Sequence, residues 1–87
     1  MTTLIVWDEP KRLSNIEKHG LDFAVLTEDF FENALIEPSY AGRSIAIGRV
    51  NGKLITVAVF RPLGSEALSV ISLRAANSRE RKRYETK

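Results

Sequence analysis

Residues 44–61 read SIAIGRVNGKLITVAVFR, two largely apolar runs separated by the dipeptide Asn51-Gly52. A two-residue type I′ hairpin prefers these two residues, because both central positions of that turn have a positive φ. The stretch therefore predicts a strand from Ser44 to Val50 that pairs antiparallel with a strand from Lys53 to Arg61. The other predicted elements can be placed outward from this hairpin.

Three more strands are predicted around the hairpin. One runs from Ala67 to Arg74, after the turn residues Pro62 to Ser65, and its apolar residues at alternating positions on both faces place it inside the sheet. Another runs from Ala34 to Glu37 and is joined to the hairpin by a turn from Pro38 to Arg43. A short apolar strand from Leu4 to Trp7 precedes them all.

The first helix is predicted from Glu9 to His19. Asp8 stands at its N-cap position, and Gly20 stands where a helix end favours a residue with positive φ. Leu13 and Ile16 form a narrow apolar stripe, which we expect to face the sheet.

A second helix is predicted from Asp22, which can cap it. Leu21 and Leu26 have the spacing of a hydrophobic staple, and Phe23, Leu26 and Phe30 follow at intervals of three and four residues. We therefore expect this helix to contribute more to the core than the first.

The last helix is predicted from Ser78 to about Glu85. Asn77 and Glu80 have the spacing of a capping box at its start. Tyr84 is its one large apolar group, so this side chain and the alkyl stems of the arginines must anchor the helix to the sheet.

These elements describe one α+β domain over residues 1–87, with an N-terminal strand and two helices, an antiparallel sheet of three or four strands and a C-terminal helix. The chain is 44% apolar and 28% charged, which is typical of a globular protein. It has no cysteine, no signal-peptide pattern and no long apolar run, so we expect a cytoplasmic protein without disulfides or a membrane segment. One histidine and scattered carboxylates predict no metal site, and no cofactor motif is present.

Positive charge is concentrated at the C-terminal end of the chain. Residues 74–87 hold six basic and two acidic side chains, whereas residues 1–73 hold seven and nine. Such asymmetry is typical either of a protein that binds a polyanion or of a solvated charged face.

The residue types at this end suit cleavage of RNA without a metal ion. In that reaction the 2′-hydroxyl loses a proton, charge on the phosphate oxygens is stabilised, and the 5′-oxygen leaves protonated. Arg61 and Arg74 end neighbouring predicted strands and Arg79 opens the last helix, so we expect one concave patch of guanidinium groups around the phosphate. Tyr84 and Glu80, on one face of that helix, are candidates for positioning or moving protons.

Other side chains are candidates for supporting roles. His19 lies in the last turn of the first helix, where it can act as an acid or bind phosphate, or instead cap a carbonyl or pack against a neighbour. Lys53, Arg81 and Arg83 are predicted to add RNA-binding charge.

Fragments along the whole chain resemble the BrnT family, ribonuclease toxins of bacterial type II toxin-antitoxin systems. Each fragment is short, but their order and spacing make the resemblance specific. The matching residues are Trp7-Asp8-Glu9, Lys11, Asn15, Lys18-His19-Gly20 and Phe23, then Arg43, Ile47-Gly48 and Gly52, and finally Ile71-Ser72, Arg74-Ala75, Arg79-Glu80-Arg81 and Tyr84-Glu85.

This resemblance implies a RelE-like fold and an endoribonuclease that arrests growth. It also implies a cognate antitoxin, a BrnA-like ribbon-helix-helix protein that binds DNA and represses its own operon. The toxin would then contact DNA only through the antitoxin.

Two positions depart from the family pattern. Family members often carry an arginine just before the glycine of the last strand connection and another on the strand before Ile-Ser, where this chain has Leu63 and Ser69. Arg61 lies on the same face of its strand as Leu63, about 6 to 7 Å away, and is a candidate replacement. Ser69 has no obvious substitute, so the departures predict weaker or differently tuned activity.

Two alternatives remain open at this point. The chain could be a non-catalytic RNA- or DNA-binding module, whose affinity would fall steeply with salt. Its candidate stacking aromatics, Tyr40, Phe60 and Tyr84, are dispersed in the sequence. It could also be a protein-interaction domain whose basic helix docks a partner segment, a role compatible with a toxin that an antitoxin covers.

Overall fold

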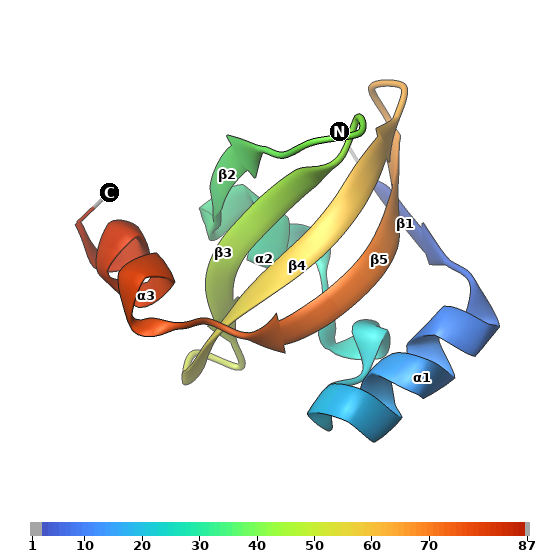
Figure 1. Cartoon of the computed structure of the whole chain (residues 1–87). Helices are drawn as coiled ribbons and strands as arrows, with labels where there is room; N and C mark the ends of the chain where they lie inside the picture. The colour runs from blue at the N-terminus through green and yellow to red at the C-terminus, as the bar shows by residue number, and fades with distance from the viewer. Residues whose placement is uncertain (1–2, 87) are drawn as a thin grey trace.

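The computed structural model describes residues 3–86, which form one five-stranded sheet with helices on both faces (Figure 1). The strand order is β1-β5-β4-β3-β2; β1 pairs parallel with β5, and the other neighbours are antiparallel. The predicted α+β class is confirmed, with a parallel strand added at one edge. The elements are β1 (Leu4–Trp7), α1 (Glu9–His19), the 3-10 helix η1 (Phe23–Val25), α2 (Glu28–Asn33), β2 (Leu35–Pro38), β3 (Ser44–Val50), β4 (Leu54–Leu63), β5 (Ala67–Ala75) and α3 (Ser78–Glu85).

The connection between the two strands of the central hairpin is one residue longer than predicted. Asn51 and Gly52 have φ values of 54° and 69°, the positive values that a type I′ turn needs. However, Val50 pairs with Leu54, so the connection also contains Lys53 and has three residues rather than two.

At its far end β4 continues through Pro62 to Leu63, whereas the sequence predicted a turn from Pro62. β3 ends at Ser44, opposite Phe60, so one side of β4 has no strand partner beyond that point. A proline is tolerated there because it lacks only an N–H that no neighbouring strand requires.

A bulge interrupts the pairing of β4 with β5. Val59 pairs with Ser72 and Phe60 with Val70, which leaves Ile71 as an extra residue in β5. A bulge of this kind bends a strand and changes the direction of its side chains.

The two faces of the sheet are covered differently. On one face, η1 and α2 bury a core that includes Phe23, Phe30, Ala58, Val70 and Leu73. On the other face, α3 covers only one end of the sheet. There it packs over a smaller cluster that contains Ile47, Ile55, Val57 and Ala76, with Leu35, Ile45 and Tyr84 packed against it. We call the remainder of this second face the open face.

The predicted second helix is wrong as a continuous element. Asp22 caps only the short η1, which ends at Leu26 in extended conformation. The chain forms a helix again after Thr27, whose hydroxyl accepts the backbone N–H of Phe30 at 3.2 Å. Phe23, Leu26 and Phe30 are nevertheless buried as expected, because both short helices face the same core.

α1 has the predicted bounds, with Asp8 at the N-cap position and Gly20 at the C-cap with φ of 69°. The predicted apolar stripe is wrong at Leu13, which is 54% exposed, whereas Ile16 is half-buried; Asn15 is the buried residue of this helix. Asn15 Nδ2 donates to the Leu73 carbonyl at 2.8 Å, and Asn15 Oδ1 accepts the Leu73 N–H at 3.0 Å. β1 pairs with only the first part of β5, so this amide takes the place of a strand at the next part of that edge.

Candidate nucleic-acid interface

An ion pair joins the start of α3 to the end of β5. Arg74 donates through Nη1 and Nη2 to the two carboxylate oxygens of Glu80, at 2.8 and 2.9 Å. Glu80 Oε1 also accepts the backbone N–H of Asn77, and the Asn77 side chain accepts that of Glu80, so the predicted capping box is confirmed. The Arg74 hydrogen bonds hold the pKa of the buried Glu80 carboxyl below its ordinary value. This pair fixes the direction in which α3 leaves the sheet.

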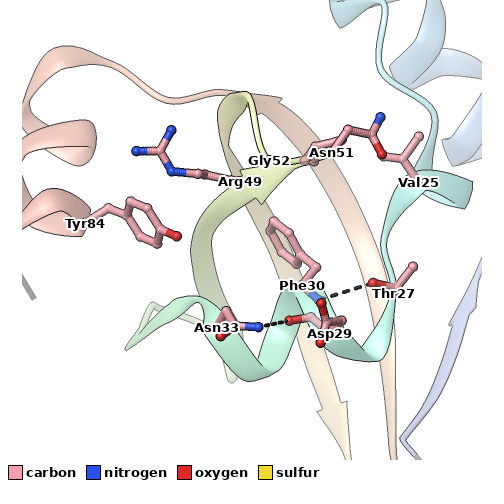
Figure 2. Close-up of a pocket in the computed structure, with 10 residues that line it drawn as sticks. Val25, Thr27, Asp29, Phe30, Asn33, Arg49, Asn51, Gly52 and Tyr84 are labelled. Carbon is pink, nitrogen blue, oxygen red and sulfur yellow. Dashed lines mark hydrogen bonds between the residues drawn. The ribbon is translucent and has the colours of Figure 1, made fainter.

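Tyr84, at the other end of α3, lines a cavity of about 440 Å³ between α3, α2 and the β3–β4 hairpin (Figure 2). The Arg49 guanidinium lies 5.8 Å from the centre of its ring, within the range of a cation–π contact. Asp29 and Asn33 line the α2 side of the same cavity. The phenol is therefore part of the packing that holds α3, as the sequence predicted, and it also borders a cavity.

The structure does not bring the three predicted phosphate-binding arginines together. β4 and β5 are antiparallel, so the predicted strand ends at Arg61 and Arg74 lie toward opposite ends of the sheet. Arg61 pairs with Ser69, whereas Arg74 pairs with Val57, four residues along β4, which is about 13 Å. Arg79 lines a separate shallow depression on α3. The predicted patch is therefore wrong, because it was inferred from the strand ends without their antiparallel direction. The catalytic roles of the three arginines remain predictions.

The remaining predicted RNA-binding cations are dispersed. Lys53 is exposed in the hairpin turn, and Arg81 is exposed on α3. Arg83 donates from Nε and Nη2 to the Glu37 carboxylate, both at 3.2 Å. α3 thus has one of its arginines held by a carboxylate from β2.

Two cavities meet on the side of the sheet next to α1, with volumes of about 220 and 360 Å³. Lys11 and Ile71 line both of them, so they form one surface, which we call the basic groove. No carboxylate is among the described residues that line it. The lining residues are Lys11, Ser14, Asn15, Lys18, His19, Ile71 and Ser72 in the first cavity, and Lys11, Arg43, Arg61, Leu63, Ser69 and Ile71 in the second.

α1 separates its charges between two sides. Arg12 pairs with Glu9 at 2.7 Å and with Asp22 at 2.9 Å, away from the groove. Lys11 and Lys18 are two helical turns apart, so they lie on one side of the helix, and both line the groove. The acidic residues around α1 therefore neutralise Arg12 and leave the groove positive.

Of the predicted site residues, the basic groove contains His19 and Arg61. Lys11, Lys18 and Arg43 were not proposed as site residues from the sequence. Lys11, Ser14 and Lys18 follow the spacing of one helical face, which is a signal that could have identified the α1 side. No local pattern could have identified Arg43, because it reaches the groove only through the pairing of β3 with β4.

A family model described as "Ribonuclease toxin, BrnT, of type II toxin-antitoxin system" matches residues 7–80. The chain belongs to the BrnT family. A crystal structure of the Brucella abortus ribonuclease toxin BrnT superposes with a TM-score of 0.83 and 56% sequence identity, covering 88% of this chain and 100% of that chain. No curated protein sequence matches.

Membership assigns this BrnT-family chain to the ribonuclease toxins of type II toxin-antitoxin systems, with an RNA target and an antitoxin partner. The resemblance read from scattered fragments of the sequence is therefore confirmed. Both family-pattern departures, Leu63 and Ser69, line the basic groove.

Residues 3–86 contain no helix with both the length and the apolar composition needed to cross a bilayer. In the same part of the chain, no three histidine, cysteine or acidic side chains are grouped where they could hold a metal ion.

Proposed function

We propose that this toxin arrests growth by cleaving RNA in the basic groove, without a metal ion. The observation that supports this location is that His19 and four cationic side chains line one continuous groove that contains no carboxylate among its described residues. A surface of this kind attracts a polyanion and repels no part of its backbone.

The groove has groups suited to the chemistry that RNA cleavage requires. Guanidinium groups of Arg43 and Arg61 can bind the non-bridging oxygens of the phosphate and stabilise the charge that develops on them. The imidazole of His19 can transfer a proton, either from the attacking 2′-hydroxyl or to the leaving 5′-oxygen. Lys11 and Lys18 would hold neighbouring phosphates along α1.

The other predicted catalytic residues receive different roles in this proposal. Arg74 and Glu80 hold α3 through their ion pair. Tyr84 and Arg79 belong to α3, which borders the same face of the sheet at its other end. An RNA strand leaving the groove across the open face would reach them as secondary contacts.

We also propose that the antitoxin partner is a BrnA-like ribbon-helix-helix protein that binds DNA, and that the pair acts in the cytoplasm. The resemblance in sequence supports this partner class. Its test is the neighbouring reading frame: a small ribbon-helix-helix protein should be encoded there, should co-purify with the toxin and should restore growth when both are expressed. A neighbouring antitoxin of another fold would contradict the assignment.

The location of the active site can be tested with purified protein and single-stranded RNA oligonucleotides in buffer containing EDTA. The wild-type chain should cleave at the same rate with and without EDTA. His19→Ala should lose about 100-fold or more in rate, the usual effect of removing a proton-transfer group. Arg61→Gln should lose about tenfold or more, because one charge-assisted phosphate contact is removed.

Arg81→Gln is the matched control. The sequence predicted that Arg81 binds RNA, but it is exposed on α3 outside the groove, so this proposal gives it no RNA contact, and the substitution removes the same charge as Arg61→Gln. It should stay within about threefold of wild type. Loss of activity in EDTA would contradict the metal-independent mechanism. Equal effects of Arg61→Gln and Arg81→Gln, or an active His19→Ala, would contradict the groove as the site.

A further inference from the structure

The side chain of Arg43 is unusual among the cations of the basic groove. It lines the 360 Å³ cavity, yet its Nε is buried and has no hydrogen-bond partner within residues 3–86. A buried N–H without an acceptor has lost its hydrogen bond to water and gained none in return, which is unfavourable. A guanidinium in this position is therefore expected to gain more than an exposed one when an acceptor enters the cavity.

The backbone around Arg43 is held tightly. The Arg43 N–H donates to the Tyr40 carbonyl at 3.1 Å, and the Arg43 carbonyl accepts the Ser39 N–H at 2.9 Å. Between them Ala41 has φ of 60°, a left-handed conformation that is unfavourable for a residue with a Cβ. Strained turns of this kind are maintained only where the surrounding structure fixes them, and they are frequent at functional sites.

This turn also connects the two arginines of the cavity. The Arg61 Nη2 donates to the carbonyl of the strained Ala41 at 3.4 Å, a long contact that leaves its other guanidinium donors available. Lys11 lines the same cavity from α1. Lys11 of α1, Arg43 of the turn and Arg61 of β4 therefore surround one space, and no carboxylate is among the described residues that line it.

We propose that Arg43 and Arg61 form a phosphate subsite of the basic groove, in which the Nε–H and one terminal N–H of Arg43 bind two oxygens of one RNA backbone phosphate. This deepens the proposed function and rests on it. A phosphate oxygen in the cavity supplies the missing acceptor for Nε, and Lys11, which lines the same cavity, adds charge from α1. A lysine cannot replace Arg43 here, because an ammonium group does not present two parallel N–H groups.

The test uses deoxythymidine 3′,5′-bisphosphate, a probe that carries backbone phosphates and lacks the 2′-hydroxyl needed for cleavage. Its affinity is measured by calorimetry for the wild type, Arg43→Lys, Arg43→Gln and the control Arg81→Lys. Arg43→Lys should weaken binding roughly tenfold, close to the loss in Arg43→Gln, since both lack the two-pronged contact. Arg81→Lys should bind as the wild type does.

Retention of affinity within twofold in Arg43→Lys would overturn the subsite while leaving the groove as the RNA site. Absence of both bisphosphate binding and RNA cleavage in the wild type would overturn the proposed function as well. Inorganic phosphate is the second probe: it should bind at least tenfold more weakly, and equal binding would identify a free-phosphate site instead of one for the RNA backbone.

A measurement on the wild-type chain alone covers the case in which Arg43 variants fail to fold. The Arg43 Nε–H resonance, assigned in isotope-labelled protein, should shift on addition of the bisphosphate, and the Arg81 Nε–H resonance should stay unchanged. Identical behaviour of the two resonances would overturn the proposal.

Discussion

Cations lie at both ends of the second face of the sheet, the end under α3 and the end next to α1, but they differ in whether a carboxylate pairs with them. At the α3 end, Arg74 and Arg83 are bonded to Glu80 and Glu37. At the α1 end, the cations of the basic groove have no lining carboxylate beside them. The richer run of arginines in the sequence is therefore the more neutralised one in the structure. Charge density along a chain identifies a binding surface poorly until the partners of each charge are known.

This difference predicts that substitutions which remove contacts at the α3 end mainly lower the stability of the fold. Glu80→Ala removes the ion pair with Arg74 and one half of the capping box, and should lower the free energy of unfolding by about 3 kcal/mol. Glu85→Ala, an exposed acid on the same helix, is the control and should change it by less than about 0.5 kcal/mol. Urea unfolding followed by circular dichroism measures both. Similar values for the two variants would show that the ion pair does not hold α3.

The same pair predicts an acid-sensitive contribution to stability. The pKa of Glu80 lies below its ordinary value of 4.5 in the folded protein, chiefly because of the Arg74 hydrogen bonds. Its stabilising effect is therefore complete above the unfolded pKa and is lost as the pH falls through the lower, folded value. The difference in unfolding free energy between wild type and Glu80→Gln should be constant from pH 6 to 7 and should shrink below about pH 4.5. A difference that stays constant down to pH 3 would contradict the assignment.

At the other end, adding charge should change binding more than stability. Ser69 lies directly opposite Arg61 in the sheet and lines the basic groove. Ser69→Arg should strengthen binding of single-stranded RNA several-fold and steepen the slope of log affinity against log salt by about 0.7, the value for one more phosphate contact. Ala24→Arg, at an exposed residue of η1 on the other face of the sheet, is the control and should leave the slope unchanged. An unchanged slope in Ser69→Arg would mean that RNA does not pass this part of the sheet.

The smallest expected effect concerns the turn that carries Arg43. Ala41→Gly relieves the cost of its positive φ and should raise the free energy of unfolding by up to about 1 kcal/mol. Ala24→Gly, at an exposed residue of η1, should lower it instead. If Ala41→Gly also loses stability, the turn is not strained, and one reason for assigning function to it disappears.

Much of the fold could be predicted from the sequence, because its local signals are strong. Asn51-Gly52 marked the hairpin, Gly20 the end of α1, and Asn77 with Glu80 the start of α3. The second helix was mispredicted since its apolar spacing persists across Thr27, where the backbone is extended and a new cap begins. The spacing of Phe23, Leu26 and Phe30 identified these residues correctly as buried. It could not show that they belong to two short helices with an extended segment between them.

The site was less predictable, because it depends on pairings between distant parts of the chain. The arginines at the strand ends were expected to meet, whereas antiparallel pairing separates them. The assignment of Leu13 to the buried face of α1 failed for a related reason: the helix meets the exposed edge of a strand, and an edge requires a hydrogen-bonding amide rather than an apolar side chain. Neither fact is encoded within a window of a few residues.

The side-chain amide of Asn15 has a consequence for when the basic groove can form during synthesis of the chain. Its partner, Leu73, is 58 residues further along the chain. While β5 is still inside the ribosome, α1 with its lysines and histidine has been made, but the strand edge that fixes the orientation of this helix is missing. The α1 wall of the groove can therefore reach its final position only after β5 has left the ribosome.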